Sequence, residues 1–139
     1  MTQDVFAPTI QKTNELLRDI EEEFGWQERR NQSYAALRCA LHTLRDRLTA
    51  VEAAQFGAQL PMLVRGMFFE GWKPTARPIK MSREEFLNKV QQEFQFFIDR
   101  PIADLVRVVM LVVHKHVSSG ELGDIRSSLP KEFSDLLPE

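Results

Sequence analysis

Apolar residues recur every three or four positions along most of the chain, which is the spacing of an amphipathic helix. The clearest example is residues 37–48, LRCALHTLRDRL, where Leu37, Leu41, Leu44 and Leu48 lie at i, i+4, i+7 and i+11. One segment departs from this period. Residues 105–113, LVRVVMLVV, are rich in valine, and taken alone they predict a buried strand.

An internal repeat resolves the valine-rich segment. Residues 37–61 align with residues 106–130 at an offset of 69, and the segment before them aligns at an offset of 70. Homologous halves should share a backbone, so 105–113 is predicted to be a helix like its counterpart. We infer a tandem duplication of a unit of about 70 residues. The identical pairs in the longer alignment are Arg38/Arg107, Glu52/Glu121, Leu60/Leu129 and Pro61/Pro130.

Capping patterns place the helix boundaries. TAVE at 49–52, SREE at 82–85 and SSGE at 118–121 each put a hydroxyl residue three positions before Glu, which is typical of a capping box. The Leu-Pro steps at 60–61 and 129–130 end one helix and begin the next. The predicted helices span 9–25, 32–48, 50–58 and 61–69 in the first unit, and 82–97, 101–117, 119–127 and 130–137 in the second.

These elements predict an all-α fold: two tandem pseudo-symmetric four-helix units forming one compact helical bundle. The single domain comprises unit 1 (about 9–72), unit 2 (about 80–138) and a Pro/basic linker at 73–81. With 139 residues the chain can bury a core without a disulfide or a metal. The helix at 101–117 is apolar on nearly every side, which predicts either the central helix of the domain or a dimer interface.

Charge and composition restrict the possible partners. The net charge of −2 is shared evenly between the two halves, so no nucleic acid is expected as a partner. The basic-leaning stretch with Lys73, Arg77, Lys80 and Arg83 is either a solvated linker or a contact for an anion or a nucleic acid. The chain has one cysteine, no secretory signal, and no apolar run long enough to span a bilayer, which predicts a cytoplasmic protein.

The sequence shows no catalytic, metal or cofactor motif. His114 and His116 lie at i and i+2, so they point away from each other on a helix, and Cys39 lies mid-helix, where a reactive thiolate is not favoured. Phosphate-binding glycine loops and nucleophile elbows are absent. We therefore expect no cofactor, no metal and no catalytic residue, although distant residues can assemble a site that one sequence does not reveal.

Two features are candidates for binding. Arg38 and Arg107 occupy the same position in each unit, where they either bond to helix ends or carboxylates, or form a pseudo-symmetric pair of anion contacts. The stretch RGMFFEGWKP at 65–74 is either a hinge between the units or a binding patch. In the second case Arg65 and Glu70 are its polar anchors, and the apolar area comes from Phe68, Phe69 and Trp72.

The segment QLPMLVRGMFFEGWKP, with the repeated Leu-Pro elements, resembles a bacterial family known as domain of unknown function 2267. The likeness covers residues 10–138. It implies a small, all-helical, duplicated bacterial protein, and it implies no activity or catalytic residue. The matching LPxLxRGxxxEGW pattern comprises Leu60, Pro61, Leu63, Arg65, Gly66, Glu70, Gly71 and Trp72.

Two functions follow as hypotheses. The first is a protein-interaction or self-association module without catalysis, with a protein partner or a homodimer. The alternative is a small-ligand or anion-binding protein that uses Arg38, Arg65 and Arg107.

Overall fold

The computed structural model describes residues 4–74, 77–117 and 119–138. Within these residues every regular element is a helix, which confirms the all-α prediction. No helix among them is long and apolar enough to cross a membrane. The elements are α1 (Ala7–Phe24), α2 (Arg30–Arg47), α3 (Ala50–Ala58), α4 (Met62–Phe69), α5 (Arg83–Glu93), α6 (Ile102–His116), α7 (Ser119–Ser128) and the 3₁₀ helix η1 (Lys131–Leu136).

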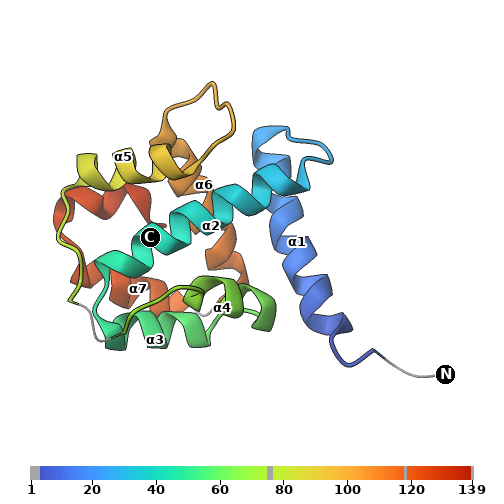
Figure 1. Cartoon of the computed structure of the whole chain (residues 1–139), viewed down its shortest axis with the longest axis horizontal. Coiled ribbons are helices and arrows are strands. Elements are labelled where there is room, and N and C mark those ends of the chain that lie inside the picture. Colours follow the sequence, from blue (N-terminus) through green and yellow to red (C-terminus); the bar gives the residue numbers. More distant parts are fainter. Residues whose placement is uncertain (1–3, 75–76, 118, 139) are drawn as a thin grey trace.

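Helix α2 crosses the middle of the molecule in front of α6, and the other helices pack around this pair (Figure 1). Both α1 and α5 contact α2 and α6, while α4 packs on α2 and η1 packs on α6. The shorter helices α3 and α7 contact each other. The first turns of α1 extend away from the rest of the fold toward the N-terminus (Figure 1).

The valine-rich segment is helical, as the repeat predicted, and it lies within α6. Its side chains are buried against α1, α2, α5 and η1, apart from Arg107 and Leu111. This burial makes α6 the central helix rather than a free interface. The apolar area removed from water offsets the few tenths of a kcal/mol per valine that restriction of χ1 costs in a helix.

Two capping boxes form as predicted. Thr49 and Ser82 each accept the backbone N–H of the Glu three positions later, and that Glu side chain accepts the backbone N–H of the cap. The third predicted cap, Ser118, lies outside the described residues.

One predicted helix boundary is wrong by more than two residues. Helix α5 ends at Glu93 instead of 97, because Phe94 adopts an extended backbone and packs its buried ring against Trp26, with ring centroids 6.0 Å apart. The last predicted helix forms at Lys131–Leu136 and is of the 3₁₀ type. Helix α1 begins at Ala7, two residues earlier than predicted, with a proline in its first turn.

Several features are consistent with the duplication, which stays a prediction. Pro61 and Pro130 precede the last helix of each unit with nearly equal φ/ψ of −55°/150° and −55°/152°. Helix α1 packs on α6 while α5 packs on α2, which is the exchange that a two-fold axis would produce. Both members are buried in the aligned pairs Leu16/Phe86, Leu17/Leu87, Ile20/Val90, Leu37/Val106, Leu41/Met110, Leu44/Val113, Phe56/Ile125 and Leu60/Leu129.

Candidate functional site

Three side chains of α2, at i, i+4 and i+7, hold the C-terminal end of α4. The last carbonyl groups of a helix lack partners within that helix, so they need donors from elsewhere. We call Arg38, His42 and Arg45 the α4 clamp. Its bonds run from Arg38 Nη1 to Glu70 Oε1 (2.6 Å), from His42 Nε2 to the Met67 carbonyl (2.6 Å), and from Arg45 Nη1 to the Phe68 and Glu70 carbonyls (2.8 Å each).

Arg65 likewise supplies hydrogen-bond donors to carbonyl groups at the end of α3. Its guanidinium donates to the carbonyl groups of Gly57 (3.2 Å), Ala58 (3.1 Å) and Leu60 (3.1 Å), although the residue is exposed. The Gly57 carbonyl also accepts the Leu60 N–H at 3.1 Å, so Arg65 adds donors at a helix end where the last carbonyl groups lack their usual helical partners. The hydrogen bonds that Arg65 donates therefore go to backbone carbonyl groups of the same chain.

Arg107 ties η1 to α6 in the second unit. Its Nη2 lies 2.9 Å from Asp135 Oδ2, its Nε lies 3.1 Å from the Asp135 carbonyl, and its Nη1 pairs with Asp104. Arg38 and Arg107 thus each tether the last short helix of their own unit, through different carboxylates. This arrangement supports the structural role that the sequence left open for them.

The aromatic residues of the motif pack mainly inward. Phe68 is fully buried and meets Phe56 edge-on, while Phe69 and Trp72 are half-buried with ring centroids 5.0 Å apart. A Cβ at Gly57 would lie 2.3 Å from Phe69 Cζ, so only glycine leaves room for this ring. Phe68 is therefore part of the core and offers no surface to a partner.

A cluster of exposed apolar side chains lies where α1 meets α4. Phe6 is 57% exposed, Ile10 42%, Met62 58% and Leu63 48%. The two helices meet where the Leu63 N–H donates to Thr9 Oγ1 at 3.1 Å, and Thr9 directly precedes Ile10 in α1. We call these four residues the apolar surface.

The first turns of α1 carry half of this surface. Phe6 and Ile10 continue the core-facing stripe of α1 that includes Leu17, because the three lie at i, i+4 and i+11. The other helices do not cover the start of α1, and between Asp4 and Lys12 every residue except Thr9 is exposed. We call residues 6–14 the α1 arm.

The model of the family described as an uncharacterised conserved protein, DUF2267, matches residues 13–136. The chain belongs to the DUF2267 family. This match confirms the resemblance drawn from the Leu60–Trp72 pattern, and in this DUF2267 protein the charged members of that pattern bond within the chain. No curated protein matches the chain.

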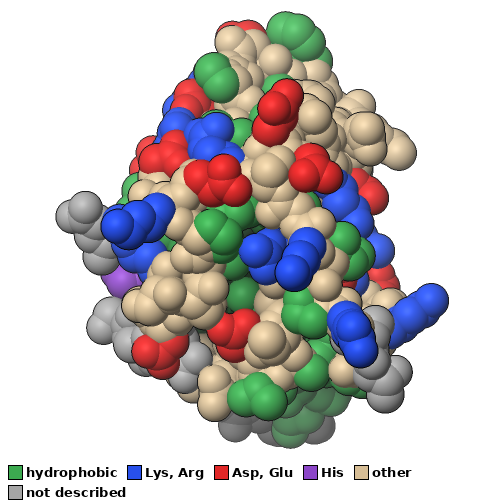
Figure 2. Space-filling model, turned by 90° about the vertical axis from the view of Figure 1, so that its left-hand side faces the viewer, with side chains coloured by type: hydrophobic (Ala, Val, Ile, Leu, Met, Phe, Trp, Pro, Cys, Tyr) green, Lys and Arg blue, Asp and Glu red, His purple; other side chains and the backbone are tan. Residues whose placement is uncertain are grey.

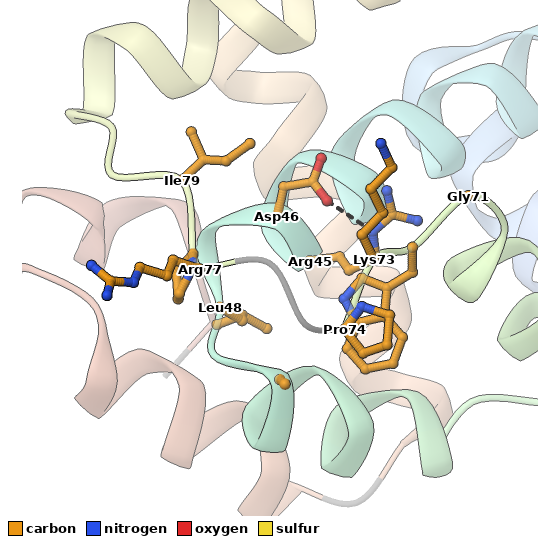
Figure 3. Close-up of a pocket in the computed structure, with 11 residues that line it drawn as sticks. Arg45, Asp46, Leu48, Gly71, Lys73, Pro74, Arg77 and Ile79 are labelled. Atoms are coloured by element: carbon orange, nitrogen blue, oxygen red, sulfur yellow. Dashed lines mark hydrogen bonds and ion pairs between the residues drawn. The ribbon is translucent and has the colours of Figure 1, made fainter.

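The basic-leaning stretch of the DUF2267 chain borders a cleft of about 240 Å³, which lies between the end of α2 and residues 71–74 and 77–79. Figure 3 shows Lys73 and Arg77 extending away from this hollow, while Arg45 Nε is bonded to Asp46 Oδ1 at 3.0 Å. Leu48 and Pro74 supply apolar wall. The cations do not converge on one point, so the cleft is not a built anion site.

A second groove, of about 220 Å³, runs between α2 and α5 and contains Cys39, His42, Lys89 and Glu93. Burial raises the pKa of Cys39 to about 11, so the thiol stays protonated near neutral pH. Burial also lowers the pKa of His42, which keeps the ring neutral as its Nε2 donates to Met67. No nucleophile is activated here, and the described residues contain no cluster able to hold a metal ion.

Figure 2 shows acidic and basic side chains interspersed over the face that lies at the left of Figure 1. A surface for duplex nucleic acid needs clustered positive charge. This face has no such cluster.

Sequence reasoning missed Arg45 and the residues of the α1 arm. Arg45 is only 6% exposed, yet in the sequence it is one of several arginines near a helix end. Phe6 lies before the helix predicted from residue 9, and nothing in the sequence marks Ile10 as uncovered. The spacing of Arg38 and Arg45, about two helical turns, places both on one face of α2, and this was the sequence feature that could have indicated the α4 clamp.

Proposed function

We propose that this DUF2267 protein is a protein-interaction or self-association module that binds through the apolar surface and performs no catalysis. The observation that carries the proposal is the exposure of Phe6, Ile10, Met62 and Leu63 together on two adjoining helices. Isolated exposed apolar residues are common, but contiguous groups mark binding sites.

The α1 arm strengthens this proposal. Short helices are marginal in water unless an apolar face is packed against something. The arm has an apolar stripe that the rest of the chain leaves uncovered. A partner that packs on the stripe would supply the missing contacts.

The arginines support the alternative function less well. Arg38, Arg65 and Arg107 all bond to carboxylates or carbonyl groups of the chain itself. An anion would have to displace these partners. We therefore base the interaction on the apolar surface, and we expect neither a nucleic acid nor a cofactor to be involved.

We place the module in the cytoplasm of a bacterium. The family resemblance supports a bacterial source. A single cysteine, free and buried in α2, fits a reducing compartment, where disulfides are rare.

The test replaces Phe6 by Glu and uses Phe97→Glu as the matched control. Phe97 is 84% exposed on the loop between α5 and α6, outside the apolar surface. We expect Phe6→Glu to reduce association with a captured partner or a second copy by roughly tenfold or more, as for a central interface residue. Phe97→Glu should leave association unchanged, and circular dichroism should show both variants folded.

Leu63→Glu repeats the test from α4 and should give the same loss as Phe6→Glu. Equal association by wild type, Phe6→Glu and Leu63→Glu would contradict the proposal. A loss confined to Phe97→Glu would place the binding surface on the other loop.

A further inference from the structure

Gly66 lies in the middle of α4 with no reason for being glycine within its own chain. Its φ is not in the left-handed region, and a Cβ added to it would meet nothing within 4 Å. Glycine in a helix interior costs roughly 1 kcal/mol relative to alanine. The usual compensation is a close approach of another backbone, and the described chain makes no such approach at this position.

The residues around Gly66 indicate which kind of element could pack against α4 at this position. Met62 and Leu63 both lie one turn before Gly66 on the exposed surface of α4, so the missing side chain leaves a notch beside two apolar side chains. Gly123 in α7 is equally open, but it follows the buried Leu122 and precedes Asp124, and it has no exposed apolar companions among the described residues. A notch with apolar walls fits the ridge of a second helix.

We infer that the helix in this notch is the α1 arm of a second copy of the chain. Phe6 and Ile10 of one copy pack against Met62, Leu63 and Gly66 of the other, and a two-fold axis repeats the contact. This inference rests on the proposed function and names the partner of the same surface.

The two contact elements match in length. The helical part of the arm, residues 7–14, and the eight residues of α4 each extend about 12 Å. Each copy therefore offers one uncovered arm and one empty notch, and a closed two-fold exchange covers both without a third component.

The exposed apolar area of each copy determines how stable a dimer we expect. The four half-exposed side chains offer apolar area on the order of 400 Å² per copy, which is typical of a functional patch. A standard interface buries about 800 Å² per partner, so polar edges must supply the rest. We therefore expect a dimer that dissociates on dilution rather than an obligate one.

The experiment compares wild type with Gly66→Gln, which fills the notch with a long side chain that favours helix. Gly123→Gln is the matched control, because both glycines are exposed, helical and open. Sedimentation equilibrium from micromolar to near-millimolar protein gives the dimer fraction. Thermal unfolding at the lowest concentration, where dimers have dissociated, reports the fold of each monomer.

We expect wild type and Gly123→Gln to dimerise equally and Gly66→Gln to dimerise at least tenfold more weakly. Both variants should melt at the wild-type temperature or a few degrees above it, since each replaces a helical glycine. Retention of the dimer by Gly66→Gln would overturn the inference.

A wild type that stays monomeric throughout the range would also overturn the second copy as partner. The proposed function would survive that result if a different protein bound wild type and failed to bind Phe6→Glu. It would fail only if neither kind of association depended on the apolar surface.

Discussion

At the scale of single residues, the charged members of the Leu60–Trp72 pattern hold helix ends in place. Arg65 closes the end of α3, and Glu70 closes the end of α4 through its side chain and its carbonyl. Gly71 has a φ of +72°, which suits the left-handed turn after a helix. The sequence shows these residue types, but Arg38 and Arg45, the partners of Glu70, lie 32 and 25 positions away, and only folding brings them together.

Gly57 is expected to tolerate no side chain. Its Cβ would lie 2.3 Å from Phe69 Cζ and 3.1 Å from Phe68 Cδ2, and the ring of Phe69 is held between Phe68 and Trp72. Gly57→Ala should therefore destabilise the fold by about 1–3 kcal/mol despite the better helix propensity of alanine. Urea unfolding measures this change, and a stability equal to or above wild type would show that Phe69 moves freely.

Arg45 and Arg38 should differ sharply as members of the α4 clamp. Arg45→Ala leaves two carbonyls of a buried helix end without donors and should cost about 2–4 kcal/mol. Arg38→Ala removes an exposed ion pair to Glu70, which should cost at most about 1 kcal/mol. Chemical denaturation of the two variants side by side tests the clamp, and equal losses would contradict it.

At the scale of helices, periodicity and capping predicted most elements to within a few residues. The helix at 102–116 required the internal repeat, because valine propensity alone favours a strand. The end of α5 escaped prediction because Phe94 leaves the helix to pack on Trp26, a contact between distant segments. Local sequence carries no information on such a contact.

The attachment of η1 to the fold should depend on pH. The hydrogen bond from Arg83, with further support from Arg107, lowers the pKa of Asp135 from 3.8 to about 2. A carboxylate with a depressed pKa in the folded state stabilises the fold above its unfolded pKa, and this stabilisation is lost as pH falls toward 2.

Asp135→Asn is expected to flatten the dependence of unfolding free energy on pH between about 4 and 2. Asp135 is 45% exposed, so solvent screening keeps the effect small. Thermal melts across this pH range measure the slope. An unchanged slope in the variant would show that other carboxylates dominate acid unfolding.

At the scale of the whole molecule, the long helices of each predicted unit pack on those of the other. Helix α1 contacts α6, and α5 contacts α2. We therefore expect a fragment of residues 1–74 to lack a cooperative unfolding transition, because α6 forms the centre of the core. Circular dichroism during urea titration checks this, and a sigmoidal transition would show that the first unit folds alone.

The apolar surface could not be predicted from the sequence, because its exposure depends on how the whole molecule packs. Phe6, Ile10 and Leu17 share one stripe, and only the ends of the neighbouring helices decide which of them is covered. The absence of catalytic motifs was visible in the chain. The location of the proposed binding surface was not.

Hydrogen–deuterium exchange of the α1 arm is the most direct test of the interface. The amides of residues 10–14 should exchange more slowly as protein concentration rises from micromolar to near-millimolar, because a second copy covers the arm only when dimers form. Residues of α3 should exchange at the same rate throughout. Arm amides whose exchange does not depend on concentration would contradict the proposed dimer.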